Sequence, residues 1–463
     1  MPYGRRAWLE DKLRSLESAG IIEEMTHVDG ILHVSPVVIV PKKNNKFRMA
    51  VDYRKLNENL KVETMPLPNI RDCIEKLSKK TYFTALDITC AFHQLELCEE
   101  TKKMLAFVTL GKRYITHRMP FGAHPCPAKF QETMMRVFKS IPPEKCTIYM
   151  DDILVHSSTF EEHLIDLEEV FCQIRRHGLK LSPSKCFYFQ PNIEYLGFVV
   201  GDHGGKLGYS PLPSKISALT SRTLPKTAKD VRSFCGGLQF YNSLVPNLNL
   251  MLAPLHKGAA KTPFVMTDKM KESFYMVKTC LQDDIMLAFP DFSLPFKLST
   301  DASYAGAAGI LSQCTPDGKD EIIYAFSKSF DDVQTRWAIC ELECLALVWS
   351  LDKMKELLLG VPFTWVTDSL VLKQMIENPP RDLSRSGRKI QRYVDFINSF
   401  QITIRHAKGD KPETQLADFF SRSPVLAIKD LFRVQITKQQ WIEAAAEDTE
   451  LINRTGVWKK IPK

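Results

Sequence analysis

The sequence predicts a multidomain protein of the α+β class, in which two regions of mixed strands and helices flank a helical stretch. Its 463 residues suit about two to four domains at roughly 100–200 residues each. Apolar runs of strand length recur from about residue 35 to 205 and again from residue 296, whereas helical spacing dominates between about 206 and 285. These three patterns indicate separate modules.

The composition agrees with folded modules. Hydrophobic residues make up 44% and charged residues 25% of the chain, a balance typical of proteins with buried cores. The formal charge of +8 agrees with a protein that handles a polyanion, although many basic proteins bind none. The 12 cysteines form no CxxC pair and no cysteine–histidine cluster at zinc spacing, so we assign no zinc site. No stretch approaches the ~20 apolar residues of a membrane span, so we expect a soluble protein with no membrane partner.

The first elements are a helix and two strands joined by a basic tip. Residues 7–19 carry leucines at helical spacing and end at Gly20, and a short apolar strand follows from Ser35 to Val40. Three lysines and one arginine then lie within residues 42–48, before and at the start of the next strand. Cations at such a tip can reach anions, but a solvated hairpin end has the same pattern.

Three aspartates follow strands in the first region. The strand Tyr82–Leu86 ends on Asp87, and residues 148–155 read as apolar strand, acidic turn and apolar strand, with Asp151 and Asp152 at the tip. A helix then begins at a capping box of Thr159 and Glu162. We expect this helix to cover the sheet that carries Asp151.

The helical stretch 206–285 is expected to be interrupted at Pro246 and Pro254, because proline lacks the N–H donor that a helix needs. It forms a separate helical subdomain in this interpretation. A new α/β pattern begins after it.

Four acids in the second region repeat the arrangement of the first. The strand Phe296–Thr300 ends on Asp301, before a small-residue strand from Gly306 to Ile310. A helix over about 336–359 holds Glu343 among leucines, with Glu341 as the alternative to Glu343. The strand 363–367 ends on Asp368, and a second helix holds Asp418.

Carboxylates that lie close together raise one another's pKa unless a cation neutralises them. Asp87, Asp151 and Asp152 are therefore a candidate two-metal site for joining a hydroxyl to a phosphate, although a solvated turn is the alternative for the Asp151–Asp152 pair alone. The four acids of the second region are a candidate for the hydrolytic counterpart, in which two metal ions orient a water against a phosphodiester.

Taken in order, these motifs resemble the reverse transcriptase–RNase H segment of a gypsy-type (Metaviridae-like) LTR retrotransposon Pol polyprotein. The resemblance covers nearly the whole chain. In the first half the matching stretches are Phe47–Asn57, Leu86–Asp87 with Ala91–Phe92, Arg118–Gly122 with Phe130–Gln131, Tyr149–Asp152 and Tyr195–Phe198. In the second half they are Pro290–Ser293, Thr300–Ser303, Glu343 within its helix, Thr367–Asp368, and Ala417–Asp418 with Ser421–Arg422.

The resemblance implies a right-hand polymerase (fingers, palm and thumb) followed by an RNase H-like α/β domain. The corresponding ranges are 1–205 for fingers and palm, 206–285 for the helical thumb, 286–425 for the RNase H domain and 426–463 for a spacer toward an integrase. The implied activities are RNA- and DNA-directed DNA synthesis and cleavage of the RNA in RNA/DNA hybrids, which together replicate a retrotransposon genome.

The resemblance also implies a role for each candidate residue. Asp87, Asp151 and Asp152 become the polymerase metal ligands, and the four acids of the second region become the RNase H ligands, with two Mg²⁺ ions per site and Mn²⁺ as the alternative. Arg48 with Lys42 or Lys43 would bind the triphosphate. Phe92 would occupy the space of a ribonucleotide 2′-hydroxyl, with core packing as the alternative. Phe121 and Gly122 would lie under the sugar and base, and residues 178–181 would position the primer terminus.

Three positions depart from the family pattern. Residues 125–127 read Pro-Cys-Pro where Asn-Ala-Pro is usual, Ser369 stands where a histidine often follows the third RNase H acid, and the loop at 409–415 is longer than usual. Two alternatives therefore stay open: an active polymerase whose RNase H domain only grips the duplex, and a catalytically silent nucleic-acid-binding relic.

The implied partners are an RNA template, a DNA or RNA primer, an RNA/DNA hybrid and dNTPs, with a homodimer left open. The implied location is cytoplasmic, within virus-like particles, and entry into the nucleus with the integration complex is left open.

Overall fold

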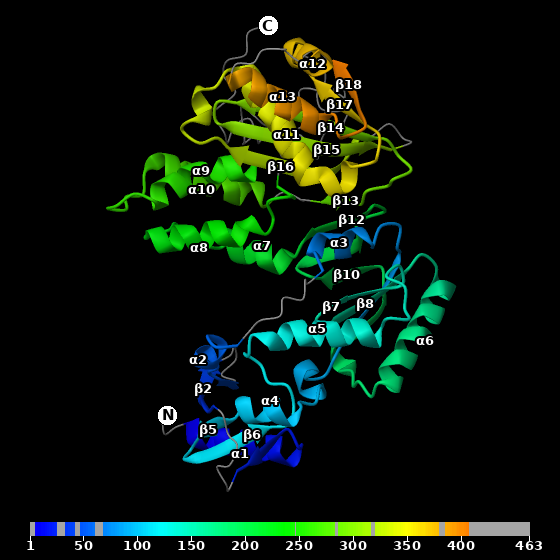
Figure 1. Cartoon of the computed structure of the whole chain (residues 1–463), viewed down its shortest axis with the longest axis vertical. Coiled ribbons are helices and arrows are strands. Elements are labelled where there is room, and N and C mark those ends of the chain that lie inside the picture. Colours follow the sequence, from blue (N-terminus) through cyan, green and yellow to red (C-terminus); the bar gives the residue numbers. More distant parts are fainter. Residues whose placement is uncertain are drawn as a thin grey trace, which may run out of the picture. The chain divides into compact units, whose positions relative to one another are not determined.

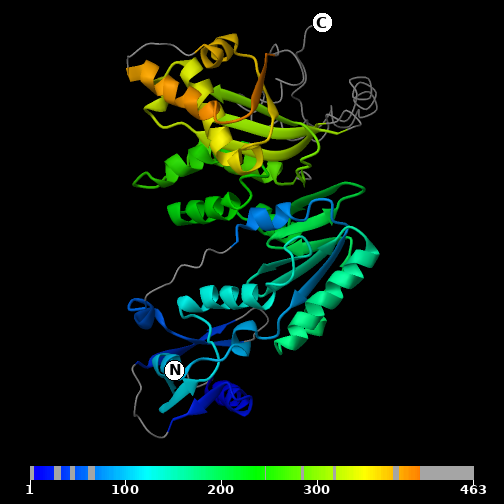
Figure 2. The ribbon, with the colours of Figure 1, turned by 45° about the vertical axis from the view of Figure 1, so that its right-hand side comes forward.

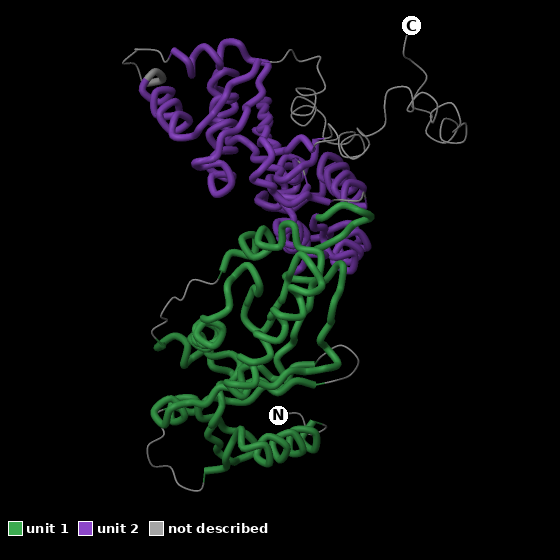
Figure 3. The backbone as a smooth tube through the Cα atoms, turned by 90° about the vertical axis from the view of Figure 1, so that its right-hand side faces the viewer, with its two compact units in different colours: residues 1–196, 200–207 green, residues 197–199, 208–463 purple. Residues whose placement is uncertain are grey.

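The computed structural model describes residues 5–25, 33–41, 47–60, 68–245, 247–282, 286–315, 320–378 and 385–406. Three candidate site residues, Lys42, Lys43 and Asp418, lie outside these ranges. The chain forms two compact units, one of residues 1–196 and 200–207 and the other of residues 197–199 and 208–463 (Figure 3). Each unit is described by itself. No helix in the described part of the chain is long and apolar enough to span a membrane.

The first unit begins with helix α1 (Arg6–Ser18) against a small mixed sheet (Figure 1). The sheet has the order β1-β6-β5-β2-β3. Its strands are β1 (Ile22–Glu24), β2 (Ser35–Pro41), β3 (Phe47–Val51), β5 (Phe107–Thr109) and β6 (Lys112–Thr116). Leu9, Leu13 and Leu16 of α1 are buried in one apolar cluster with Phe107 and Tyr114 of the sheet. These leucines, whose helical spacing places them on one face of α1, therefore form part of the core of this subdomain.

A second sheet of the first unit carries the candidate acids. Its order is β7-β8-β4-β9, and all pairs are antiparallel. The strands are β4 (Tyr82–Asp87), β7 (Cys146–Tyr149), β8 (Asp152–Ser157) and β9 (Phe187–Gln190). The main helices of this part are α5 (Pro125–Val137) and α6 (Phe160–Arg176) (Figure 2). Both helices contribute buried side chains to the apolar core beneath the sheet.

Helix α6 begins as the sequence predicts. The Thr159 side chain accepts from the Glu162 N–H at 3.2 Å, and the Glu162 side chain accepts from the Thr159 N–H at 3.3 Å. The predicted capping box is confirmed. The buried face of α6, which includes Leu167, Val170 and Ile174, places the helix along β8.

Shorter elements complete the first unit. They are α2 (Arg54–Asn57), α3 (Ile70–Glu75), the 3₁₀ helices η2 (Ala91–Gln94) and η3 (Pro183–Lys185), α4 (Glu99–Met104), and the strands β10 (Asn192–Tyr195) and β11 (Phe198–Asp202) at the boundary of the units.

The second unit starts with a helical segment. Its helices are α7 (Pro213–Thr220), α8 (Ala228–Gln239), α9 (Leu248–Ala259) and α10 (Asp268–Cys280). The prediction that the helical stretch begins at about residue 206 was wrong, because β12 (Leu207–Pro211) comes first and pairs with β13 (Leu287–Ala288). A Cβ on Gly208 would lie 2.5 Å from the Leu287 carbonyl oxygen, so only glycine permits this close pairing.

The predicted helix stop at Pro254 was also wrong. Pro254 lies inside α9, between the buried residues Leu252 and Leu255. Burial of the apolar face of α9 therefore outweighs the loss of one N–H donor at the proline. Pro246 lies outside the described residues.

The second unit ends in an α/β domain whose five-stranded sheet has the order β16-β15-β14-β17-β18. The strands are β14 (Phe296–Ser303), β15 (Gly306–Cys314), β16 (Asp320–Ser329), β17 (Phe363–Thr367) and β18 (Ile402–His406). Pairs among β14, β15 and β16 are antiparallel, whereas β14, β17 and β18 run parallel. The other elements are η4 (Gln334–Arg336), α11 (Ile339–Leu358), α12 (Leu370–Glu377) and α13 (Arg385–Ile397). Buried leucines of α11 and Trp365 of β17 share one apolar core.

Candidate active sites

The three acids of the first unit gather where β4 and β7 end and β8 begins. Asp87 and Asp152 are directly paired residues of the antiparallel strands β4 and β8. Asp151 is the second residue of the two-residue loop between β7 and β8, directly before Asp152. The structure therefore brings together the three carboxylates that the sequence selects.

The loop that carries Asp151 is held from behind by Gln131. Met150, the first residue of this loop, has a positive φ of 56°. Its N–H donates to Gln131 Oε1 at 2.6 Å, and Gln131 Nε2 donates to the Ile148 carbonyl at 3.3 Å. Gln131 is fully buried on α5. A side chain from a distant helix thus fixes a backbone conformation that is unusual for methionine.

Charge repulsion marks these carboxylates as a group that needs a cation. The pKa of Asp152 is raised from 3.8 to about 6, first because its carboxyl loses surrounding water and then because Asp151 and Asp87 lie nearby. Lys185 of η3 supplies one cation, with its Nζ 3.1 Å from Asp87 Oδ1 and 3.2 Å from Asp87 Oδ2. Asp87 in turn raises the pKa of Lys185.

The donor set suits a hard divalent ion. Carboxylate oxygens are ligands that Mg²⁺ prefers, and a bound cation would relieve the repulsion that raises the pKa of Asp152. Within the described ranges, no three or more Asp, Glu, His or Cys side chains converge as a preformed metal site. The chemistry of Asp87, Asp151 and Asp152 therefore fits a metal ion, with Lys185 balancing part of the charge.

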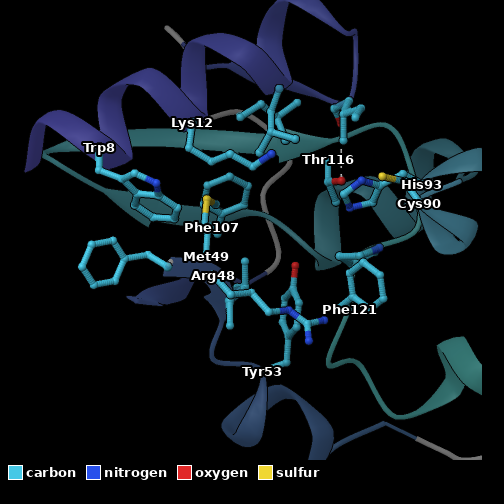
Figure 4. Close-up of a pocket in the computed structure, with 17 residues that line it drawn as sticks. Trp8, Lys12, Arg48, Met49, Tyr53, Cys90, His93, Phe107, Thr116 and Phe121 are labelled. Atoms are coloured by element: carbon cyan, nitrogen blue, oxygen red, sulfur yellow. Dashed lines mark hydrogen bonds between the residues drawn. The ribbon is translucent and has the colours of Figure 1, made fainter. Parts of the chain in front are cut away.

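A cavity of about 280 Å³ lies between α1 and the small mixed sheet (Figure 4), and none of the three acids lines it. Arg48 and Phe121 form part of its wall, and the Arg48 guanidinium lies 4.8 Å from the centroid of the Phe121 ring. Phe92 is only 9% exposed, and its ring lies 4.8 Å from Phe121 and 5.0 Å from Phe130. Phe92 is therefore fixed between two rings, while Phe121 stays 40% exposed.

Gly122 shapes the turn after Phe121. Its φ is +102°, a conformation that favours glycine. Asn57 holds both sides of this turn, because its Nδ2 donates to the Gly122 carbonyl at 3.0 Å and its Oδ1 accepts from the His124 N–H at 2.9 Å. The motif residues 47–57 and 118–122 are thus joined directly.

The segment 178–181 lies beside the residues that follow Asp87. Leu181 forms an isolated bridge with Ile88, and the Lys180 carbonyl accepts from the Thr89 N–H at 2.9 Å. Gln94 bonds Lys180 through both ends of its amide. This contact fixes the segment next to the first acid.

Two acids of the second set, Asp301 and Asp368, belong to the neighbouring parallel strands β14 and β17 or directly follow them. Ser299 of β14 pairs with Val366 of β17. Asp301 lies two residues beyond Ser299, and Asp368 lies two residues beyond Val366, directly after the end of β17. The prediction that the strand ends on Asp301 was wrong, because pairing with β15 continues β14 to Ser303. Trp365 Nε1 donates to Thr300 Oγ1 at 2.9 Å and links the two strands just before the acids.

Glu343, and not Glu341, faces this second set. The pKa of Glu343 is raised, chiefly by burial and also by Asp368, while the nearby Ser369 side chain opposes this shift. Glu341 instead lies 3.9 Å from Lys389 Nζ on α13. His406 bonds the Asp368 carbonyl through Nε2 at 3.1 Å, so it contacts the backbone beside the acid.

Sequence reasoning missed Lys185, Asn57 and Trp365 as parts of the sites, and it gave Gln131 no role. Gln131 and Asn57 lie within motif stretches that the sequence shows. No local pattern singles out Lys185, which reaches Asp87 across 98 positions of sequence.

Comparison with known families matches both regions. The family "Reverse transcriptase (RNA-dependent DNA polymerase)" matches residues 40–200, and the "RNase H-like domain found in reverse transcriptase" matches residues 266–365. The chain carries a reverse transcriptase domain followed by an RNase H-like domain. The three acids of the first unit lie in the reverse transcriptase domain, and Asp301 and Glu343 lie in the matched RNase H-like range.

Relatives of this chain are retrotransposon polyproteins. It is 32% identical over 421 residues to the retrovirus-related Pol polyprotein from transposon 297 of Drosophila melanogaster, covering 89% of this chain and 38% of that protein. It is 27% identical over 470 residues to the transposon Tf2-3 polyprotein of Schizosaccharomyces pombe, covering 98% of this chain and 34% of that protein. The chain thus spans between 34% and 38% of the length of these two relatives. The predicted resemblance to gypsy-type Pol polyproteins is confirmed.

Solved structures confirm the predicted fold class. The foamy viral protease-reverse transcriptase in complex with dsDNA has a TM-score of 0.76 at 22% identity, covering 87% of this chain and 83% of that chain. The same protein in complex with RNA/DNA hybrid has a TM-score of 0.72 at 21% identity, covering 89% and 55%. The likeness shows a right-hand polymerase fold with an RNase H-like domain.

Proposed function

We propose that this chain is an active RNA- and DNA-directed DNA polymerase that also cleaves the RNA of RNA/DNA hybrids, and so replicates a retrotransposon genome. The observation that carries the proposal is the presence of two separate groups of carboxylates, each including a pair on or directly after neighbouring strands: Asp87 with Asp152 in one unit and Asp301 with Asp368 in the other. Keeping like charges together is costly unless they serve a cation.

In the polymerase site, Asp87, Asp151 and Asp152 would hold two Mg²⁺ ions, or Mn²⁺, which when bound activate the primer 3′-hydroxyl and stabilise charge on the α-phosphate. Gln131 keeps the Asp151 loop in its conformation through Met150. Arg48 binds the triphosphate charge, assisted by Lys42 or Lys43, and the Phe121 ring supports the sugar and base over Gly122.

Phe92 selects deoxynucleotides in this proposal. Its ring is held between Phe121 and Phe130 and would occupy the space that a 2′-hydroxyl needs. Phe92→Ala should raise incorporation of rNTPs relative to dNTPs by roughly tenfold or more. An unchanged ratio in primer extension would assign Phe92 to core packing alone.

In the RNase H-like domain, Asp301, Glu343, Asp368 and Asp418 would hold the metal ions that orient a water against the RNA phosphodiester. The Ser369 side chain lies near Glu343, so the residue that departs from the family pattern still borders the proposed site. The proposed partners are an RNA template, a DNA or RNA primer, an RNA/DNA hybrid and dNTPs, with a homodimer as an open alternative. The proposed location is a cytoplasmic virus-like particle.

Two assays with crossed controls test both activities. Primer extension on an RNA template with dNTPs should be lost in Asp151→Asn and kept in Asp301→Asn. Release of labelled RNA fragments from a hybrid should show the reverse. Activity that survives the substitution in its own site would contradict the proposal for that site.

The same assays separate the alternatives. DNA synthesis without hybrid cleavage by the parent chain would select a polymerase whose RNase H domain only grips the duplex. Absence of both reactions together with retained hybrid binding would select a silent nucleic-acid-binding relic.

A further inference from the structure

The space between α1 and the small mixed sheet, which we call the α1 cavity, has room for a small molecule. Its volume is about 280 Å³, roughly twice the ~150 Å³ that accommodates one benzene ring in a protein interior. Trp8, Lys12 and Leu16 form its wall on the α1 side (Figure 4). No residue of α1 belongs to the acid sets or to the candidate nucleotide-binding residues. The α1 cavity therefore has a wall that the proposed reactions do not use.

Most of the lining of the α1 cavity is apolar. Trp8 of α1 and Phe47 of β3 pack edge to face with their ring centroids 5.5 Å apart, and Phe107 of β5 is buried beside them. The aliphatic and thioether side chains in the lining belong to Leu16, Ile21, Ile22, Met49, Ala50, Val51 and Pro120. Walls of this kind favour a flat apolar body, because rings gain both burial and edge-to-face contacts.

Two hydroxyl groups in the lining already have partners. The Tyr53 hydroxyl donates to the Leu105 carbonyl at 2.9 Å, and the Thr116 hydroxyl donates to the Arg118 carbonyl at 2.7 Å. Each hydroxyl has a single hydrogen to donate. Recognition of a polar group on a ligand therefore falls to the charged side chains.

The charged side chains in this lining are cationic. Lys12 of α1 and Arg48 of β3 line the α1 cavity, and no aspartate or glutamate among the described residues does. Neither cation forms an ion pair within the described ranges, and the Arg48 guanidinium lies over the Phe121 ring. Burial and then the charge of Lys12 lower the pKa of His93, so His93 stays neutral near pH 7. Two cations without an acid favour an anion in a largely apolar space.

We propose that the α1 cavity binds a small aromatic carboxylate, with fused rings against Trp8 and Phe107 and the carboxylate attracted by Lys12 and Arg48. A neutral aromatic molecule would use the rings alone, and inorganic phosphate would use the cations alone. Arg48 and Phe121 are also assigned to the nucleotide, so a bound aromatic acid should compete with dNTP. This competition rests on the proposed function, whereas binding of the acid does not.

Binding of naphthoate tests the α1 cavity without requiring catalysis. Naphthoate is titrated into the full chain, and isothermal titration calorimetry gives its Kd. Naphthamide, a neutral molecule of nearly the same shape, is the comparison ligand. The parent chain should bind naphthoate about 5- to 20-fold more tightly than naphthamide, because hydrogen bonds to a charged group are the stronger ones.

Three variants assign the binding to the charge and the rings of the α1 cavity. Lys12→Gln should weaken naphthoate binding about 3- to 10-fold and leave naphthamide binding unchanged, because only a charge is lost. Arg14→Gln is the matched control, since Arg14 is a cation of the same helix that does not line the cavity, and both ligands should bind as to the parent. Trp8→Ala should weaken both ligands, because it removes part of the aromatic wall.

Equal affinities of the parent for the two ligands would overturn the proposal. A naphthoate affinity that Lys12→Gln leaves unchanged would overturn it as well, because the acid would then bind elsewhere on this basic chain. Loss of naphthoate binding in Arg14→Gln would point to the same conclusion.

Primer extension tests the competition and separates it from the proposed function. Naphthoate should raise the apparent KM for dNTP of the parent, and it should do so less in Lys12→Gln, whose activity without naphthoate should be parental. Inhibition that added dNTP does not relieve would overturn the competition. A parent that binds naphthoate as expected but extends no primer keeps the aromatic-acid site and overturns the proposed polymerase activity.

Discussion

Gln131 Oε1 accepts a hydrogen bond from the Met150 N–H at 2.6 Å. Through this bond, a fully buried amide on α5 holds the loop between β7 and β8 in a left-handed conformation at Met150. The position of Asp151 in the proposed polymerase site thus depends on a buried side chain behind the loop. Gln131 is a positioning residue.

Gln131→Leu should therefore slow DNA synthesis and leave RNA cleavage unchanged. Leucine fills the space but leaves the Met150 N–H and the Ile148 carbonyl without their partner, at a cost of about 1–3 kcal/mol. If the loop shifts in response, the rate constant for nucleotide addition should fall about 5- to 100-fold with little change in the KM for dNTP. Single-turnover primer extension measures both quantities.

The neighbouring residue offers the control for this variant. Glu132 pairs with Lys129 and Arg136 on the outer face of α5. Glu132→Gln should keep the parental rate. Equal rates for Gln131→Leu and the parent would show that the loop holds its conformation without the amide.

The ion pair between Lys185 and Asp87 predicts an effect on metal affinity. Lys185→Gln removes a cation whose Nζ lies 3.1 Å from Asp87 Oδ1. The Lys185 side chain is 65% exposed, so the pair contributes at most about 1 kcal/mol. The Mg²⁺ concentration for half-maximal primer extension should then fall by about fivefold or less. A rise in that concentration would show that Lys185 assists metal binding rather than competing with it.

Local sequence patterns correctly predicted the helix ends and strands that are decided by interactions between residues close in sequence. The strand 363–367 and the capping box of Thr159 were predicted correctly, because a two-residue period or a side-chain-to-backbone bond three residues apart decides them. The strand that ends on Asp87 was also predicted from its own residues.

Contacts between distant segments decide what the sequence could not predict. β14 continues past Asp301 because β15 pairs with it, and α9 continues through Pro254 because its neighbouring leucines are buried. The contact of Lys185 with Asp87 joins residues 98 positions apart. In each case a partner elsewhere in the chain overrides the local preference.

The raised pKa of Asp152 predicts how stability depends on pH in the absence of metal. The pKa of the Asp152 carboxyl is about 6 in the folded chain and near 3.8 in the unfolded chain, so ionisation of this carboxyl lowers the stability of the fold. That cost is absent below about pH 3.8 and complete above about pH 6. In chelator at pH 7, Asp152→Asn should be more stable than the parent by on the order of 1 kcal/mol, a figure reduced for solvent exposure.

Thermal unfolding in chelator at several pH values measures this difference. The advantage of Asp152→Asn should shrink as the pH falls from 6 toward 4. Asp202→Asn, an exposed acid outside the site, should show no such trend. An advantage that stays constant with pH would exclude repulsion among the three acids as its cause.

Substitutions of two glutamates of α11 should have very different effects on hybrid cleavage by the RNase H-like domain. Glu343 lies near Ser369 and Asp368, whereas Glu341 lies 3.9 Å from Lys389. Glu343→Gln should lower hybrid cleavage by about 100-fold or more, because metal stabilisation of several kcal/mol would be lost. Glu341→Gln should lower it less than about threefold. Both variants should extend primers at the parental rate, and equal cleavage by the two would contradict this assignment.

A buried polar network behind the polymerase acids predicts the last effect. His163 of α6 bonds Thr84 of β4 through Nε2 at 2.7 Å and Ser157 of β8 through Nδ1 at 3.0 Å. The Ser157 hydroxyl lies 2.7 Å from Asp166 Oδ2, which in turn is close to the Lys145 ammonium. The imidazole thus connects the strands that carry Asp87 and Asp152.

His163→Leu should destabilise the first unit by about 2–4 kcal/mol, because Thr84 and Ser157 lose a buried partner. Burial lowers the pKa of His163 below 6.5, so the unfolded chain binds the proton more readily and the parent loses stability as the pH falls below about 6.5. The difference between parent and His163→Leu in urea unfolding should therefore be largest near pH 7.5 and smaller at pH 5.5. Glu168→Gln on the exposed face of α6 is the control, and a difference that grows toward acid pH would show that the imidazole is protonated in the folded chain.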